Sequence, residues 1–308
     1  MNPLRLSRRG PGVPATLRGR PHRRSTIVMR PWDWAVPPRC VDLEIISAVP
    51  AGWDEAPPGQ RKPPLLFIHG MESGAWAFAE RWMAGALRRG YPAYALSLRG
   101  HGNSGGHDRR QITLFREYIA DILQAIITLP EPPVLVGHSM GALLAQEVAS
   151  RYPARGLVLV APAPAYGVVG NALAQLRHHP VGALRSLLTG SGSPEMMFAT
   201  LDPDRARLYA DRMAGVAPIT VVQLLQSRTV GPVFCPVAVV GAKEDALIRP
   251  QDIKHTAAMY GVRPIWLPGA GHEVMLDAGA GVSLDIILDW VDSDVVVGRD
   301  RTATTTVR

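Results

Sequence analysis

The chain of 308 residues is poor in several features that would each point to a definite class of protein. Two cysteines, Cys40 and Cys235, are too few for a disulfide framework or a zinc site. Both lie beside expected strands and are predicted to be buried thiols. No apolar run reaches the ~18 residues of a membrane span, so no spanning helix is expected. No apolar stretch of the secretory type occurs at the start, and nothing demands an oxidising compartment, which favours the cytoplasm.

Acidic residues are missing from the first 30 positions, which contain eight arginines between Arg5 and Arg30. The formal charge of +7 comes from this segment, because the remaining residues carry 25 basic and 26 acidic side chains. The segment is rich in Pro and Gly without apolar periodicity, so residues 1–32 are expected to form a disordered extension. A transit peptide or a phosphate-binding arm is the alternative. No recognition motif accompanies the charge, and we expect no nucleic-acid partner.

Alternating strand and helix patterns fill most of the chain. Buried apolar strands joined by helices predict an α/β fold with a mostly parallel, doubly wound sheet. Residues 33–162 and 233–293 would form this core, and residues 294–308 a flexible tail. Crossovers of this kind bring the carboxyl ends of the strands to one edge, where α/β sites form. Strands are expected at 41–46, 64–68, 91–98, 134–136, 157–160, 236–241 and 264–267, and helices at 75–89, 114–129, 142–149, 251–260 and 282–291.

Residues 163–232 interrupt this alternation. Several short helical stretches follow one another without a strand, separated by prolines from Pro164 to Pro218. About seventy residues between two sheet strands are too many for a simple crossover. The segment is therefore predicted to be a helical cap inserted over the strand ends, with both of its ends returning to the same sheet.

One serine stands in the local context of a nucleophile. The expected strand Val134–Val136 leads into Gly137-His138-Ser139-Met140-Gly141, and a helical stretch follows at once. A strand, a tight turn and a helix around a serine are what a nucleophile elbow requires. The glycines two positions before and after Ser139 supply the space that lets strand and helix approach.

A base and an acid for this serine follow later in the chain. His272 lies in a glycine-rich loop directly after the last expected strand, and Asp245 lies just after the strand 236–241. A serine needs a base to take its proton, and a carboxylate fixes the tautomer of that base. The order Ser139, Asp245, His272 is the order of α/β-hydrolases. Glu244, one residue before Asp245, is the alternative acid.

With these motifs the chain resembles the α/β-hydrolase superfamily, and within it the capped serine hydrolases of esterase or lysophospholipase type. The resemblance covers about residues 60–292. It implies that Ser139 attacks an acyl carbonyl, that His272 acts as general base and then general acid, and that Asp245 orients it. It also implies an oxyanion hole from the backbone N–H groups of Met71 and Met140, and a site without cofactor or metal. The matching segments are His69-Gly70, residues 98–104, Gly137–Gly141, Gly241–Asp245 and Gly271-His272.

Four apolar residues are candidates for the acyl pocket. Flexible Met side chains suit irregular apolar ligands, so Met196 and Met197 are expected to line it, together with Phe198 and Trp76. Helix packing inside the cap explains the Met196–Phe198 cluster about as well.

The expected reaction is hydrolysis of a carboxylic ester of a small or lipophilic acyl substrate, such as a monoacyl lipid. The serine at the elbow excludes relatives of this fold that place an aspartate or a cysteine there, namely dehalogenases, epoxide hydrolases and dienelactone hydrolases. Thioester hydrolysis, C–C bond hydrolysis, cofactor-free haloperoxidase activity and acyl transfer stay open, as does a non-catalytic ligand-binding role. The oligomeric state is not fixed by the sequence.

Overall fold

Seven strands form one sheet in a computed structural model that describes residues 38–57, 60–181, 193–215 and 217–297. Their order is β1-β3-β2-β4-β5-β6-β7, with β1 antiparallel to β3 and every other pair parallel. The mostly parallel sheet is therefore confirmed. The strands are β1 (Ile45–Ala48), β2 (Leu65–Ile68), β3 (Ala93–Leu96), β4 (Val134–His138), β5 (Gly156–Val160), β6 (Val237–Ala242) and β7 (Ile265–Leu267).

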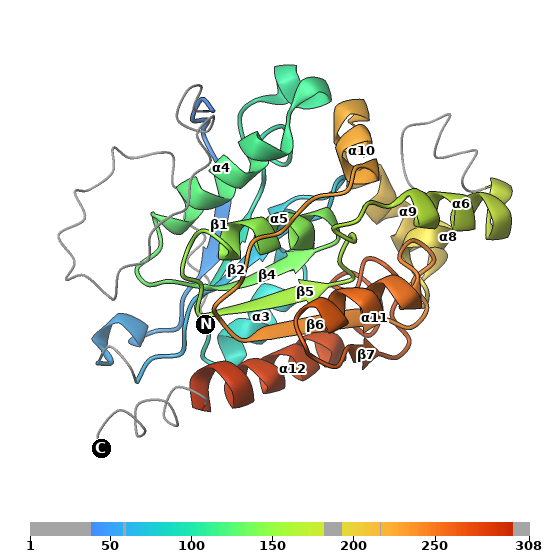
Figure 1. Cartoon of the computed structure of the whole chain (residues 1–308). Coiled ribbons are helices and arrows are strands. Elements are labelled where there is room, and N and C mark those ends of the chain that lie inside the picture. The colour runs from blue at the N-terminus through green and yellow to red at the C-terminus, as the bar shows by residue number, and fades with distance from the viewer. Residues whose placement is uncertain (1–37, 58–59, 182–192, 216, 298–308) are drawn as a thin grey trace.

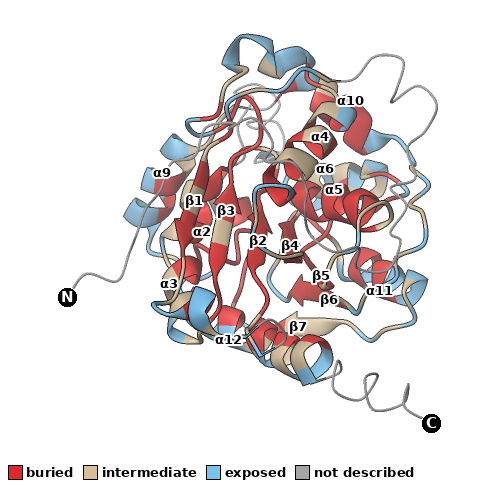
Figure 2. Cartoon of the chain, turned by 90° about the vertical axis from the view of Figure 1, so that its left-hand side faces the viewer, coloured by how far each residue is buried: buried red, intermediate tan, exposed pale blue. Residues whose placement is uncertain are grey.

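Helices cover both faces of this sheet, as the doubly wound prediction requires (Figure 1). Leu65 and Phe67 of β2 pack into one core with α2, α3 and α12. Leu66 and Ile68, the alternate residues, pack into a second core with α4, α5 and α11. Both cores consist of buried residues, which line the strands in Figure 2. The helices are α2 (Ala75–Ala79), α3 (Trp82–Arg88), α4 (Phe115–Ile126), α5 (Met140–Ala149), α11 (Pro250–Met259) and α12 (Ala280–Trp290), with 3-10 turns η1 (Trp53–Glu55) and η2 (His107–Ile112) and a π-helical turn η3 (Val291–Val296).

The first strand lies at the sheet edge, as expected, but it begins later than its alternating pattern predicts. The expected strand 41–46 is replaced by β1 at Ile45–Ala48. The residues just before β1 form hydrogen bonds with the loop that follows β3, and not with a strand. The carbonyl of Asp42 accepts from the N–H of Gly105 at 2.7 Å, and the N–H of Glu44 donates to Ser104 Oγ at 2.8 Å.

The helix expected over residues 75–89 is two helices. Between α2 and α3, Arg81 has φ −142° and ψ −43°, outside the helical region. Trp82, the first residue of α3, is fully buried and its indole N–H donates to the carbonyl of Ala280 at 2.8 Å. The break thus lies where α3 is fastened to the start of α12, a contact between distant residues that helical periodicity does not reveal.

In the described part of the chain, four helices follow β5 and precede β6. They are α6 (Val169–His178), α8 (Pro194–Met197), α9 (Pro203–Arg212) and α10 (Pro218–Leu225). No strand occurs in this segment among the described residues, and Figure 1 shows these helices beyond the arrowheads of β4 and β5. That they act as a cap over a substrate stays a prediction. In the described ranges, no helix is both long and apolar enough to cross a bilayer.

Three further predictions concern the N-terminal extension, the C-terminal tail and the two cysteines. The extension predicted at residues 1–32 lies outside the described residues, as does most of the predicted tail, although its first residues belong to η3. Cys40 is exposed, so the prediction of a buried thiol is wrong there, because Cys40 precedes β1 and lies outside both cores. Cys235 is half-buried, and burial raises the pKa of its thiol to about 12.

Candidate active site

Ser139 occupies a strained turn between β4, which ends at His138, and α5, which begins at Met140. Its φ of +52° with ψ of −117° is a conformation that a residue with a side chain rarely adopts. The N–H of Ser139 donates to the carbonyl of Val160 at 3.0 Å, and its carbonyl accepts from Ala163 at 3.1 Å. Neighbouring backbone thus holds the strained residue on both sides.

The two glycines of the elbow have no room for a side chain. A Cβ on Gly137 would lie 2.6 Å from the Cα of Ala142. A Cβ on Gly141 would lie 2.4 Å from the carbonyl oxygens of both Ile68 and His69. Because the obstacles are backbone atoms, a small side-chain movement would not relieve them. This close approach is the one predicted from the glycine spacing.

Gly141→Ala is therefore expected to destabilise the protein by about 3 kcal/mol or more, because overpacking against backbone forces the helix from the strand. Gly281→Ala is the matched control, since Gly281 lies exposed in α12 with nothing within 4 Å of its ideal Cβ. The control should raise stability by roughly 0.5–1 kcal/mol through helix propensity. Thermal unfolding of the two variants tests this, and equal melting temperatures would contradict the packing argument.

The structure brings Ser139, His272 and Asp245 together at the carboxyl ends of three strands. His272 Nε2 lies 3.0 Å from Ser139 Oγ, and His272 Nδ1 lies 2.9 Å from Asp245 Oδ2. These residues follow β4, β7 and β6 respectively. The second oxygen of Asp245 accepts from the N–H groups of Leu247 at 2.7 Å and Ile248 at 2.9 Å. A carboxylate held in this way favours the tautomer with Nδ1 protonated, which leaves Nε2 free to accept the serine proton.

Glu244 takes a different position from Asp245. Its N–H donates to the carbonyl of Ala270 at 3.2 Å, and its Oε2 accepts from the N–H of Ala270 at 3.1 Å. Glu244 is therefore bound to the backbone just before the His272 loop and is itself exposed. Of the two candidate acids, only Asp245 bonds the imidazole.

The environment of His272 favours its protonated form. Burial of the ring opposes protonation, but the charge of Asp245 and the hydrogen bond to it outweigh burial and raise the pKa of His272 above its ordinary value. The charges of Glu273 and Glu72 act in the same direction. His272 is therefore expected to be a stronger base than a histidine in water.

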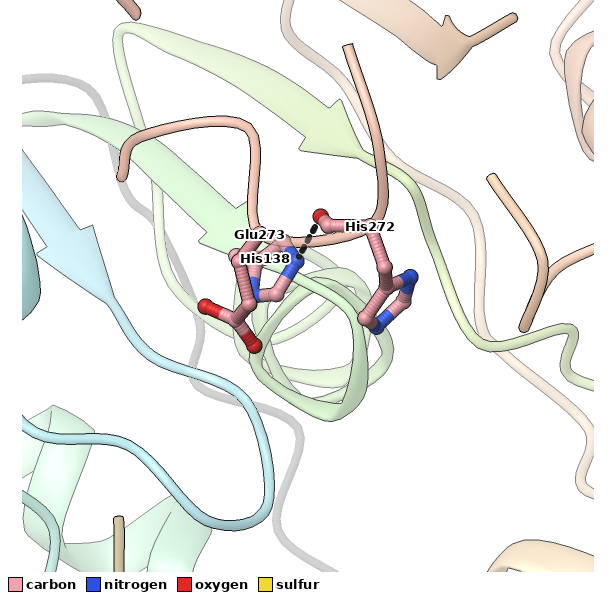
Figure 3. Close-up of side chains that lie close together, drawn as sticks. All are labelled: His138, His272 and Glu273. Atoms are coloured by element: carbon pink, nitrogen blue, oxygen red, sulfur yellow. Dashed lines mark hydrogen bonds between the residues drawn. The ribbon is translucent and has the colours of Figure 1, made fainter. Parts of the chain in front are cut away.

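A second histidine lies against His272. His138 Nε2 lies 2.9 Å from the carbonyl of His272, to which it donates, and the two ring centroids are 4.8 Å apart. Burial lowers the pKa of His138 well below its ordinary value, so the ring stays neutral. Figure 3 shows Glu273 beside this pair, and burial raises the pKa of Glu273 to about 7.

These three residues form the cluster best suited to a metal in the part of the chain that is described. His138, His272 and Glu273 offer ligand atoms within 4.8 Å of one another. Both ring nitrogens of His272 are already bonded to Ser139 and Asp245. A cation at this place would have to compete with those bonds, so we interpret His138 and Glu273 as residues that support the position of His272.

The loop after β2 passes directly against Ser139. An ideal Cβ on Gly70 would lie 3.3 Å from the Cβ of Ser139. His69 fastens this loop, because its Nε2 accepts from the N–H of Leu98 at 2.9 Å and its Nδ1 lies 2.6 Å from the carbonyl of Gly70. His101 Nε2 lies 2.8 Å from the carbonyl of Met71. Both histidines thus hold backbone rather than reach the serine.

Two backbone N–H groups lie at the start of α5 and in the loop after β2. Met71 follows Gly70, and Met140 is the first residue of α5. Within the described ranges, neither N–H donates a hydrogen bond to a protein acceptor. The N-terminus of a helix is also a favourable place for negative charge. These are the donors named for an oxyanion hole.

Of the four candidate pocket residues, Trp76 and Phe198 lie against Tyr209, and Met197 lies against the His272 loop. Trp76 is half-buried with its ring centroid 6.0 Å from Tyr209, and the Phe198 centroid lies 6.2 Å from Tyr209 on α9. Met196 and Met197 are buried, and the carbonyl of Met197 accepts from the N–H of Glu273 at 2.9 Å. Met197 and Phe198 pack within the same core as α12, which the helix-packing alternative also describes.

Tyr209 and Asp277 are not among the site residues that the sequence predicts. Tyr209 has no motif around it, and its ring contacts join segments far apart in the chain. Asp277 lies five residues after His272 and is the one charged residue in the stretch 274–282, whose other residues are apolar or glycine. A single acid among apolar residues is the only feature of the sequence that could have drawn attention to Asp277. Its partners come from another part of the chain and could not be named from sequence.

Comparison with known proteins gives one family. A model of the alpha/beta hydrolase family matches residues 65–283. Esterase PIR7B of Oryza sativa subsp. japonica is 32% identical over 115 residues, covering 36% of this chain and 41% of that protein. The match thus spans about two fifths of the length of that relative.

Solved structures show the same fold. An esterase from Exiguobacterium antarcticum superposes with a TM-score of 0.63 at 15% identity, covering 82% of this chain and 96% of the esterase. A monoacylglycerol lipase from Paleococcus ferrophilus superposes with a TM-score of 0.56 at 21% identity, covering 82% and 99%. At these identities the likeness is one of fold.

Proposed function

Because the chain belongs to the alpha/beta hydrolase family, we propose that it is a serine hydrolase that cleaves a carboxylic ester through an acyl-enzyme intermediate. One observation carries the proposal. Ser139 stands in the strained turn with its Oγ 3.0 Å from His272 Nε2, while Asp245 holds the other ring nitrogen at 2.9 Å. A nucleophile, a base and an orienting acid in hydrogen-bond contact are the arrangement that activates a serine.

The first half of the reaction forms the acyl-enzyme. Ser139 Oγ attacks the carbonyl carbon and its proton passes to His272 Nε2, giving a tetrahedral intermediate. His272 then returns this proton to the alcohol oxygen as the ester C–O bond breaks. The alcohol leaves, and the acyl group stays bonded to Ser139. Asp245 keeps the imidazolium in place and is not itself protonated.

The second half releases the acid. A water molecule attacks the acyl carbon and gives its proton to His272, and the proton then returns to Ser139 Oγ as the acyl–oxygen bond breaks. The negative oxygen in each tetrahedral intermediate would accept from the N–H groups of Met71 and Met140. Removing one such donor typically costs on the order of 3 kcal/mol of transition-state stabilisation.

The substrate class rests on the relatives and on the apolar residues near the base. The relative at 32% identity is an esterase, which favours an oxygen ester. We infer that the helices between β5 and β6 form a cap, with Trp76, Met196, Met197 and Phe198 contributing to an acyl pocket. Aromatic and Met side chains suit a lipophilic acyl chain.

A chain-length series of p-nitrophenyl esters tests the ester assignment. With acetate, butyrate, octanoate and palmitate esters, we expect turnover with a maximum at one chain length, and a burst of p-nitrophenol where deacylation is slow. Matching S-acyl thioesters and added alcohol acceptors separate ester hydrolysis from thioesterase and acyltransferase activity. Release no faster than in buffer from every ester would contradict the proposal and favour a non-catalytic binding member.

A further inference from the structure

Asp277 is a buried carboxylate that is satisfied by backbone rather than by a cation. Its residue exposure is 0%, and its hydrogen bonds in the described part of the chain come from backbone N–H groups and one hydroxyl. Its Oδ2 accepts from the N–H of Gly271 at 2.8 Å and of Ala199 at 2.9 Å. Its Oδ1 accepts from the N–H of Thr200 at 3.0 Å, the Thr200 hydroxyl at 2.9 Å and the N–H of Ala278 at 2.9 Å.

The donors come from two segments about seventy residues apart in the chain. Gly271 immediately precedes His272. Ala199 and Thr200 lie between α8 and α9, in the segment that joins β5 to β6. One carboxylate therefore bonds the loop of the proposed base and the segment of the proposed cap at the same time. If all of its donors came from residues 271–278, Asp277 would only stabilise a local turn. Its bonds to Ala199 and Thr200 show that it also holds the second segment.

Two further contacts and one close approach of the backbones join the same two segments. The N–H of Glu273 donates to the carbonyl of Met197 at 2.9 Å, and the Thr200 hydroxyl lies 3.1 Å from the carbonyl of Gly269. A Cβ on Gly271 would lie 2.7 Å from the backbone nitrogen of Ala199. The two backbones are thus in direct contact beside His272, so a displacement of one would reach the other.

The carboxylate stays charged in this position. Burial alone would raise the pKa of Asp277, but the backbone N–H groups of Ala199, Gly271 and Ala278 outweigh burial and lower the pKa. An ionised oxygen makes stronger hydrogen bonds to N–H groups than a neutral amide oxygen does. The charge therefore strengthens the connection between the two segments.

We propose that Asp277 is a positioning residue that couples the segment Met197–Thr200 to the backbone of His272, so that this part of the cap and the base keep one relative geometry. The proposal rests on the proposed function for the role of His272. It implies that the α8 end of the cap is anchored to the base loop. A substrate that displaces this end would also displace the base.

The kinetic test is Asp277→Asn. The amide keeps the shape but offers one acceptor oxygen and turns an NH2 group toward N–H donors. We expect kcat per titrated active site to fall about 10- to 100-fold with KM changed less than about threefold, because a small displacement of a base costs rate rather than binding. Thr200→Val, which removes only a hydroxyl donor from the cap side, should lower kcat about two- to fivefold in the same way.

Asp292→Asn is the matched control. Asp292 lies in η3, and its carboxylate bonds Lys62, Tyr91 and Arg89, none of which belongs to the site. Its substitution should lower the melting temperature while kcat per titrated site stays within about twofold of the wild type. Asp277→Asn with a lowered melting temperature and an unchanged kcat would reduce Asp277 to a structural residue.

Hydrogen exchange tests the coupling without any turnover. In Asp277→Asn, the amides at 199–200 and at 271–273 are expected to exchange faster together, and in Thr200→Val the 271–273 amides should also respond. Faster exchange in only one of the two segments would overturn the coupling. If Asp277→Asn does not fold, the Thr200→Val measurement decides. A wild type without turnover would contradict the proposed function, while the exchange result would still decide the coupling.

Discussion

Ser139→Ala is expected to lower kcat for ester hydrolysis by about 10⁴- to 10⁶-fold, because no other group can form the acyl intermediate at this turn. Binding should change little, since the substrate contacts and the Met71 and Met140 N–H groups remain. The alanine keeps the backbone of the elbow, so the variant should fold like the wild type. Initial rates on the best p-nitrophenyl ester, with circular dichroism to verify folding, measure this effect.

Ser150→Ala is the control for this prediction. Ser150 ends the same helix, α5, at its opposite terminus, and its hydroxyl donates to the carbonyl of Glu147 at 2.8 Å. Its loss should leave kcat within about twofold of the wild type. Retention of more than about one hundredth of the wild-type kcat by Ser139→Ala would contradict the assignment, since residual catalysis by the remaining groups is far smaller.

Asp245→Asn is expected to lower kcat by about 10⁴-fold. The amide can present its NH2 to His272 Nδ1, which then favours the tautomer with Nε2 protonated and unable to accept the proton of Ser139. Glu244→Gln is the matched control one residue away, because Glu244 bonds only the backbone of Ala270. It should leave kcat within a factor of about three. A similar loss of kcat in both variants would contradict this geometry. A loss of kcat in Glu244→Gln alone would make Glu244, and not Asp245, the acid that orients His272.

The pH dependence follows from the same pair. Only neutral His272 accepts the serine proton, so kcat/KM should rise with pH through the pKa of this group. Asp245 raises that pKa, so the acid limb of the wild type should lie above the ordinary histidine value. Asp245→Asn removes the charge that raises it, and burial of the ring alone lowers the pKa. The acid limb of the kcat/KM profile of Asp245→Asn should therefore lie at lower pH than that of the wild type. Profiles of both proteins between about pH 4 and 9 would detect this shift.

The elbow could be predicted because its determinants are local. Gly137 and Gly141 stand at fixed distances from Ser139, and the strand and helix that they separate are neighbours in sequence. The same holds for the apolar strands, whose alternate residues, such as Leu65 and Leu66, divide between two cores. These features depend on spacing within a few residues, which a single sequence displays directly.

The acid and the positioning residue depend on contacts between distant parts of the chain. Glu244 and Asp245 are adjacent in sequence, and only the placement of the His272 loop distinguishes them. Asp277 obtains donors from Ala199 and Thr200, which lie in the segment where helical patterns are least regular. The helix break near Arg81 has the same origin, because Trp82 is fastened to the start of α12. None of these partners follows from periodicity.

Peptide mapping after reaction with a fluorophosphonate tests the central claim most directly. The proposed chemistry predicts one adduct per chain, located on the peptide that contains Ser139, and no adduct in Ser139→Ala. Substitution of His272 by alanine should slow this labelling by orders of magnitude, because the serine then lacks its base. An adduct on another serine, or unmodified Ser139 in a preparation that still hydrolyses esters, would contradict the account.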